Sequence, residues 1–324
     1  MSDEIRIGPL DPADAPQLTA CFERCYGRSY IATFFYDPDA IRARMRDGRL
    51  QPVVATMPDG TIVGHMALTR RHAQALTLEA GNTIVDPSQR SQGLAARLGA
   101  ALFEVCRDGG GIGFHHYPTT AHGVMQKLAV QGGGVETGIM LGYVPAGVDY
   151  KDIGGASADR LAVVTVYQPL APAPARSVSV PPRYAAVVHE LYGKAGFARA
   201  MHPAVPPSSS STSVLHTTVA APGVVQIAVE RVGADLAAAV AQAASDAAAL
   251  VTHVDLPLDD PGTPAAVEAL RPAGFFYCAL MPEFAASDVL RLQHLHPAAE
   301  PSTLPELVNP EARALLQFAM ADRA

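Results

Sequence analysis

Tryptophan is absent from this chain of 324 residues, aromatic residues make up only 6% of it, and charged residues only 17%. Acidic residues outnumber basic ones by 31 to 24, and Lys/Arg runs are absent, which argues against nucleic acid or an anionic membrane as the main partner. No apolar stretch reaches the roughly 18 residues that a membrane-spanning helix needs. The opening sequence MSDEIRIG has neither a basic nor an apolar signal region, so we expect no signal peptide.

Cysteine is also scarce, and the chain holds four: Cys21, Cys25, Cys106 and Cys278. No Cys-x-x-Cys pair occurs and no other cluster has metal-ligand spacing, so we expect no metal site. Free thiols, buried or half-buried, are typical of a reducing compartment, which predicts a cytoplasmic protein.

What the sequence does contain is ample hydrophobic material, 49% of its residues, in a length typical of two domains. In the first half, alternating patterns predict strands and helices in turn. The strands are expected at residues 5–10, 51–57, 61–69, 75–85, 112–117 and 137–144. The helices are expected from residue 11 or 13 to 26, and at 38–46, 93–108 and 122–130.

A segment rich in Gly and Ala, residues 146–159, separates this half from a second one with a similar rhythm. Strands are expected there at residues 161–167, 224–229, 250–256 and 275–281, with helices at 184–200, 235–249 and 263–270. The shared order indicates a degenerate internal duplication. We therefore predict an α/β protein with one domain at residues 1–150 and a second at residues 160–324.

The segment most informative about chemistry is residues 84–95, in which a strand runs into a polar loop and a glycine stands where a helix begins. The first amides of that helix have no intrahelical acceptors and point outward beside the positive end of the helix dipole. Gly93 lets an anion approach the backbone closely, and Arg90 adds a permanent positive charge. The pattern indicates a phosphate site or, alternatively, an ordinary helix start beside a surface arginine.

Residues Arg90-Ser91-Gln92-Gly93-Leu94-Ala95 resemble the acetyl-CoA loop of the GNAT acetyltransferase superfamily, which reads Arg/Gln-x-x-Gly-x-Gly/Ala. Val85-Asp86-Pro87 matches the strand end that precedes this loop in the family. The resemblance implies two tandem GNAT-like domains, each with a mixed, mostly antiparallel central sheet flanked by helices. It further implies that the amides around Gln92 to Ala95 hold the pyrophosphate of acetyl-CoA, that the backbone of Ile84 and Val85 pairs with pantetheine, and that Gln126 bonds pantetheine or is exposed.

The second half resembles the same fold more faintly, through residues 251–256 and 270–276. Its counterpart of the loop, residues 229–235, lacks the glycine pattern and places Glu230 and Asp235 where a diphosphate would sit. Like charges would oppose binding there, so we expect a non-catalytic lobe that packs against the first domain.

Transfer to an amine, as the family implies, needs a base that takes the ammonium proton and an acid for the departing thiolate. Glu79 lies 11 residues before Arg90, where family members with a carboxylate base often hold it; the alternative is a glutamate on an exposed strand face. His116 and His122 are candidates for a base or an acceptor clamp, or for ordinary structural roles. Ala129 stands near the position of the usual acid, a tyrosine, so Tyr117, Tyr143 or solvent would supply that proton.

The acceptor side is expected at residues 28–37, where Tyr30, Phe35 and Tyr36 suit a small molecule with an apolar body and polar handles. Packing of Phe34 and Phe35 under the second lobe is the alternative. The prediction is an acetyl-CoA-dependent N-acyltransferase acting on a small-molecule amine, as a monomer or homodimer, without nucleic acid or membrane partners. The alternatives are a catalytically silent acyl-CoA sensor or scaffold, or another CoA-thioester enzyme such as a decarboxylase or hydrolase.

Overall fold

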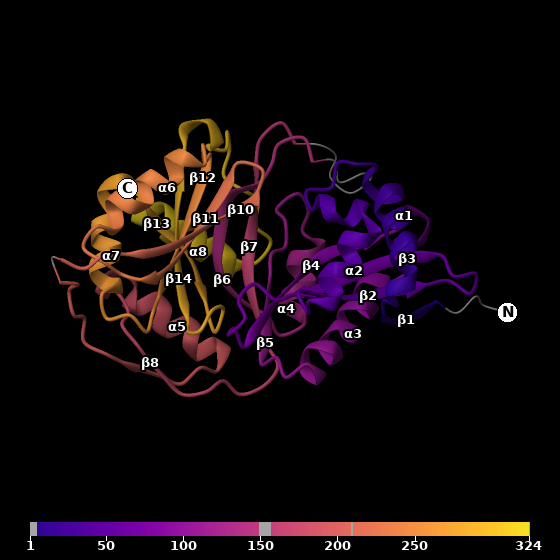
Figure 1. Ribbon diagram of the computed structural model, residues 1–324, viewed down its shortest axis with the longest axis horizontal. Coiled ribbons are helices and arrows are strands. Elements are labelled where there is room, and N and C mark those ends of the chain that lie inside the picture. The colour runs from indigo at the N-terminus through magenta and orange to yellow at the C-terminus, as the bar shows by residue number, and fades with distance from the viewer. Residues whose placement is uncertain (1–4, 149–156, 209, 324) are drawn as a thin grey trace.

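The computed structural model describes residues 5–148, 157–208 and 210–323, and shows helices packed on both faces of one long sheet (Figure 1). Its 12 strands lie in the order β1-β2-β3-β4-β5-β7-β6-β13-β14-β12-β11-β10. Neighbouring strands of this sheet are antiparallel except for the parallel pairs β4–β5 and β11–β12. The predicted α/β class with a mixed, mostly antiparallel sheet is therefore confirmed. Part of the expected boundary segment, residues 149–156, lies outside the described residues.

The strands and helices follow the chain in this order. The strands of the first half are β1 (Arg6–Pro9), β2 (Leu50–Thr56), β3 (Ile62–Thr69), β4 (Thr77–Val85), β5 (Gly113–His116), β6 (Val135–Val144) and β7 (Leu161–Pro169). Its helices are α1 (Ala15–Tyr26), α2 (Pro38–Arg46), α3 (Leu94–Asp108) and α4 (Val124–Gln131). The later strands are β8 (Arg176–Val178), β9 (Arg199–Met201), β10 (Val214–Ala221), β11 (Val224–Arg231), β12 (Val251–Pro257), β13 (Phe276–Met281) and β14 (Val289–Leu295), and the later helices are α5 (Ala185–Ala195), α6 (Leu236–Asp246), α7 (Thr263–Leu270) and α8 (Pro310–Arg323).

Both faces of the first half of the sheet are buried, which explains its long apolar strands. On β2, Val54 points into the core formed with α1 and α2, while Val53 and Ala55 point into the core formed with α3. Successive side chains of a strand alternate between faces, so a strand covered on both sides is apolar at every position. β4 contributes to both cores, with Ile84 on the side of α1 and α2 and with Leu78 and Ala80 on the side of α3.

The order of pairing repeats in the two halves. β4, β5, β7 and β6 are neighbours in the first half, and β11, β12, β14 and β13 follow the same order from the other end of the sheet. Along the chain, α3 connects the parallel strands β4 and β5, and α6 connects the parallel strands β11 and β12. β7, which follows the expected division at residues 150–160, lies hydrogen-bonded between β5 and β6.

The two halves meet where β6 lies beside β13, through a single residue pair, Gly138 and Ala279. A Cβ atom on Gly138 would overlap the carbonyl oxygen of Cys278, so glycine permits this close approach. Where β6 and β13 diverge, the carboxamide of Gln293 replaces backbone pairing. Gln293 accepts from the amide of Leu141 (2.9 Å) and donates to the carbonyl oxygens of Ile139 (3.0 Å) and Tyr277 (3.2 Å).

We expect Gly138→Ala to destabilise the protein by about 3 kcal/mol, because the new methyl group must push β13 away from β6. Gly8→Ala is the matched control, since a Cβ on Gly8 of β1 meets nothing within 4 Å, and it should change stability by less than about 1 kcal/mol. Urea unfolding monitored by circular dichroism measures both. Equal urea midpoints for the two variants would show that β6 and β13 tolerate a wider spacing between them.

Candidate functional site

In the middle of the first half β4 and β5 stop pairing, and the split between their backbone edges is called the opening below. The two strands pair from Thr77–Gly113 to Ala80–His116 and no further. β4 continues along β3 as far as Val85, while the chain after β5 follows β7, through the hydrogen bond from the Val164 amide to Pro118 (2.9 Å). The backbone edges that face each other across the opening therefore belong to strands paired only on their outer sides.

A bulge in β4 causes the divergence. The register with β3 shifts between His65 and Ala67, and Asn82 has a φ of 56°, a left-handed conformation that asparagine adopts more readily than most residues. The ring Nδ1 of His65 lies 2.8 Å from the Asn82 carbonyl oxygen, and the Tyr30 hydroxyl donates to the Asn82 side chain (3.0 Å). The bulge is thus held from two neighbouring elements.

The loop between β4 and α3 lies at the mouth of the opening. Asp86 accepts hydrogen bonds from the Arg24 guanidinium (2.6 Å) and from the amide of Ser88 (3.1 Å). Burial opposes the charge of Asp86, but these hydrogen bonds outweigh it and lower the pKa of its carboxyl group. The pairing fixes the start of the loop against α1.

The end of this loop has the backbone of an anion site. Ser91 and Gly93 have positive φ values of 63° and 71°, and Gly93 is the residue before the first turn of α3. Residues that alternate between right- and left-handed backbone conformations turn their successive amides toward one point. A Cβ on Gly93 would meet nothing within 4 Å, which leaves room for a ligand. Ser91 and Gln92 are exposed, whereas Leu94 is buried and anchors the helix in the α3 core.

The predicted base, Glu79, lies on β4 directly before the opening and is bound by an arginine. Arg71 Nε donates to Glu79 Oε2 (2.8 Å) and Arg71 Nη2 to Oε1 (2.6 Å), so both carboxylate oxygens are engaged. The Glu79 side chain is 15% exposed and that of Arg71 is 44% exposed. An acceptor that takes the place of this guanidinium would gain both carboxylate oxygens of Glu79. Nothing in the sequence around Arg71 indicated this partner.

Tyr117 lies on the same face of the sheet as Glu79, and His116 on the opposite face. Glu79 is in register with His115, and Tyr117 follows two residues later, next to the ring of Tyr143 at 6.4 Å between centroids. Burial, followed by the charge of Glu79, raises the pKa of Tyr117 well above its ordinary value, so the phenol keeps its proton at neutral pH. Tyr117 is therefore in the state that an acid requires.

The two histidines named with Glu79 are less suited to a base. His116 points toward the α3 core beside Phe114, with 5.7 Å between ring centroids, and burial lowers its pKa to about 4. Burial also lowers the pKa of His122, two residues before α4. A ring whose protonated form is so disfavoured is a weak proton acceptor at neutral pH.

The expected acceptor wall divides into two parts. Tyr30 and Tyr36 are half-buried and linked, since the Tyr36 hydroxyl oxygen accepts from the Tyr30 amide (2.9 Å). Phe35 is fully buried and stacks on Phe22 of α1, with 4.1 Å between ring centroids. Phe35 therefore belongs to the core under α1, and Tyr30, through Asn82, is the member that reaches the opening.

Gln126, expected at pantetheine or on the surface, is buried and bonded within the protein. Its amide nitrogen donates to the Thr119 carbonyl (3.3 Å), and its oxygen accepts from the amide of Val308 (3.2 Å). The side chain is 1% exposed, which argues against a contact with a ligand. Gln126 instead holds the segment that leads into α8.

In the second half, the amides of the corresponding loop before α6 are hydrogen-bonded to other groups of the protein. The amides of Val232, Gly233 and Ala234, before α6, donate to Asp260 Oδ2 (2.9 Å), Ser213 Oγ (3.0 Å) and the Ser211 carbonyl (3.0 Å). These are the amides that would face a diphosphate. Asp235 in turn accepts from the Ser213 amide (2.7 Å), so this helix start is satisfied without a ligand.

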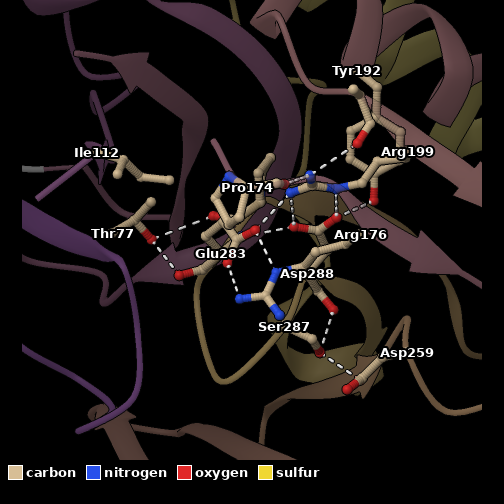
Figure 2. A network of polar contacts seen from close by, with 12 residues as sticks. Thr77, Ile112, Pro174, Arg176, Tyr192, Arg199, Asp259, Glu283, Ser287 and Asp288 are labelled. Atoms are coloured by element: carbon tan, nitrogen blue, oxygen red, sulfur yellow. Dashed lines mark hydrogen bonds and ion pairs between the residues drawn. The ribbon is translucent and has the colours of Figure 1, made fainter. Parts of the chain in front are cut away.

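A hairpin of the second half, residues 282–288 between β13 and β14, reaches the first half at the closed end of the opening. Glu283 accepts at its carbonyl oxygen from the amide (3.3 Å) and hydroxyl (2.8 Å) of Thr77, the first residue of β4 (Figure 2). The Pro282 carbonyl lies 2.9 Å from His115 Nε2. The Phe284 ring packs 5.4 Å from the rings of both His72 and His115. The second half thus supplies part of the wall beside Glu79, which sequence reasoning missed.

Buried charges hold this hairpin in place (Figure 2). Arg199 donates to Asp288 Oδ2 (2.5 Å) and Glu283 Oε1 (2.7 Å), while Arg176 donates to both oxygens of Glu283 (2.6 and 2.7 Å). The Tyr192 hydroxyl donates to Asp288 (2.7 Å). Glu283 is fully buried and has a φ of 50°, a conformation that the network must stabilise.

The first half of the chain resembles a known family. Residues 16–127 match the model of the Acetyltransferase (GNAT) family. No curated protein matches the sequence significantly. Within the described residues, no helix has the length and apolar character needed to cross a membrane, and His, Cys, Asp and Glu side chains nowhere gather in threes as a metal site would require.

Solved structures of acetyltransferases resemble about half of the chain. Mutant forms of the spermidine/spermine N-acetyltransferase SpeG from Vibrio cholerae are 12% identical, with 52% of this chain and 95% of that chain covered and a TM-score of 0.41. The putative acetyltransferase yncA from Salmonella typhimurium, solved with acetyl-CoA, is 17% identical, with 53% and 96% covered and a TM-score of 0.41. The ribosomal-protein-S18-alanine N-acetyltransferase from Escherichia coli is 18% identical, with 53% and 97% covered and a TM-score of 0.40.

We expect Arg199→Met to destabilise the protein by about 3–5 kcal/mol, because it leaves Glu283 and Asp288 buried with one fewer positive partner. Arg107→Met is the control, since Arg107 pairs with Glu104 on the surface of α3, where both side chains are more than half exposed. It should cost less than about 1 kcal/mol. Chemical denaturation measures both, and equal losses would show that the buried network contributes no more than a surface pair.

Proposed function

We propose that the chain, whose residues 16–127 match the model of the Acetyltransferase (GNAT) family, is an acetyl-CoA-dependent N-acyltransferase that acts on the amine of a small molecule. The observation that carries the proposal is the opening between β4 and β5 with the start of α3 at its mouth. Among the described residues, the equivalent amides of the second half are bonded to Asp260, Ser213 and Ser211, so the proposal concerns the first half alone.

Acetyl-CoA would bind along this opening. The edge of β4 that faces away from β3 at Ile84 and Val85 suits the amide groups of pantetheine, which can hydrogen-bond there as an added strand does once Arg90 Nε releases the Val85 carbonyl oxygen (3.4 Å). The amides from Gln92 to Ala95 suit the pyrophosphate, and Arg90 adds positive charge beside them. Ser91 shapes this loop through its positive φ.

The acceptor amine must reach the thioester as a free base. Glu79, directly or through one water, takes the first ammonium proton. The amine nitrogen then bonds to the acyl carbon and loses its second proton to solvent as the carbon–sulfur bond breaks. Tyr117 gives its proton to the thiolate, which is the role that a protonated, buried phenol on the same face can fill. A backbone amide at the open edge of β4 stabilises negative charge on the thioester oxygen.

A catalytically silent acyl-CoA sensor is the second candidate, and two observations favour it. Ala129 is buried where many relatives carry the acidic tyrosine, and Arg71 occupies both oxygens of Glu79. A sensor would bind acetyl-CoA and release no free thiol with any amine, so turnover distinguishes the two.

The second half, in this proposal, is a degenerate GNAT-like lobe at residues 160–324 beside a GNAT domain at residues 1–150, and its first strand, β7, completes the sheet of that domain between β5 and β6. The repeated order of strands and the helix start closed by Asp260 and Ser213 support this. The four buried, free cysteines suit a reducing compartment, so we place the protein in the cytoplasm, as a monomer or homodimer.

Gly93→Val should abolish stabilisation by acetyl-CoA, because a branched side chain at a positive φ distorts the loop and fills the space for the phosphates. Ligand at about 100 times its dissociation constant should stabilise the unsubstituted protein by roughly 2.7 kcal/mol. Thermal shift measures the difference. Gly99→Ala, within α3 and with nothing near an added Cβ, is the control that should keep the shift.

Calorimetry should also give one acetyl-CoA site per chain. A second site that persists in the Gly93→Val protein would contradict the closed helix start of the second half. A full thermal shift in Gly93→Val would instead show that the loop before α3 does not hold the ligand.

Glu79→Gln should lower turnover by about 100- to 10,000-fold, since it keeps the shape of the side chain and removes the proton acceptor. The affinity for acetyl-CoA should stay unchanged, and the defect should shrink as pH approaches the pKa of the acceptor amine. Release of free thiol measures the rate, with Glu104→Gln on the exposed surface of α3 as control. Near-normal turnover at pH 7 would remove Glu79 from the reaction.

A further inference from the structure

The ion pair of Arg71 and Glu79 places one positive and one negative charge side by side where the acceptor must approach. The two groups are in contact through hydrogen bonds of 2.6 and 2.8 Å. Glu79 is the inner member at 15% exposure, and Arg71 is the outer member at 44%. An acceptor ammonium that takes both oxygens of Glu79 separates this pair, and Arg71 then loses its partner.

The groups around the pair offer no second charge that could serve Arg71. His72 and His115 carry pKa values lowered by burial, so both rings are neutral at neutral pH. Tyr117 and Tyr143 keep their protons because burial raises the pKa of each phenol. The buried charges Arg291 and Asp255 form a closed pair: Arg291 donates to both oxygens of Asp255, and both side chains are 3% exposed.

We infer that the acceptor is a free α-amino acid, whose ammonium group replaces Arg71 at Glu79 and whose carboxylate takes Arg71. This inference rests on the proposed function and names its substrate class. One ion pair of the resting protein is exchanged for two in the complex, so neither protein charge is left without a partner. A planar guanidinium with several donors matches a carboxylate in particular.

Other amines fit these charges less well. A polyamine brings further positive charges toward Arg71 and nothing that pairs with it, and like charges in a partly buried site repel. An amine without a carboxylate leaves the guanidinium without its Glu79 partner. Because Arg71 and Glu79 are in direct contact, the two charges of the acceptor must also be adjacent, as they are in an α-amino acid.

The experiment measures thiol release from acetyl-CoA by the full chain with the 20 common L-amino acids, each paired with its own amide. The amide keeps the amine and the side chain and removes only the carboxylate charge. For the best acceptor, kcat/KM should favour the acid over the amide by about tenfold or more. Arg71→Gln should bring this ratio near one, and Arg71→Glu should invert it.

Arg70→Gln is the matched control, because the neighbouring Arg70 donates to the Ala75 carbonyl (3.0 Å) and forms no contact with Glu79 in the described structure. It should keep the acid-to-amide ratio of the unsubstituted protein, and the thermal shift with acetyl-CoA should confirm that each variant is folded. Equal rates for acids and amides, higher rates with spermidine, or an unchanged ratio in Arg71→Gln would overturn the inference and leave the acyltransferase standing. Thiol release with no amine at all would overturn the proposed function, and the inference with it.

Discussion

The site of the first half depends on one constraint, that β4 cannot stay in register with both of its neighbours beyond Ala80. The extra residue at Asn82 lets β4 follow β3 while β5 turns away along β7. The backbone edge that a pantetheine would need, the approach to Glu79 and the position of the α3 start all follow from this single bulge. His65 and Tyr30 stabilise the bulge from separate elements, so the packing of the folded protein itself fixes the opening.

The two ends of β4 are fixed by different parts of the chain. At the end of the strand, Arg24 of α1 binds Asp86 within the first half. At its start, Thr77 receives the hairpin of the second half, which buried ion pairs to Arg199 and Arg176 keep in one conformation. Because buried charges are costly unless paired, such a network permits few alternative arrangements. The second half, whose own helix start is closed, thus still shapes the acceptor side of the site in the first half.

Local patterns predicted the parts of the site that depend on neighbours in the sequence. Residues 90–95 form the expected loop and helix start, since a glycine at positive φ and the first amides of a helix are properties of the segment itself. Phe35 and Gln126 could not be placed in this way, because α1 and the segment before α8 bury them. β14 was not predicted for a similar reason: its polar residues Arg291 and Gln293, which suggest an exposed face, are buried by partners on β12 and β6.

A continuous sheet of 12 strands has two edges, whereas two separate sheets would have four. β6 and β13 meet through one residue pair, and both are buried along nearly their whole length. Apart, each would present unpaired backbone groups beside apolar side chains, the kind of surface that recruits a strand from another molecule. The outer edges that remain are β1, which is only 4 residues long, and the 8-residue β10, on which the polar His216, Thr217 and Thr218 are exposed together with Val219. Joining the halves in one sheet therefore protects the protein against edge-to-edge aggregation.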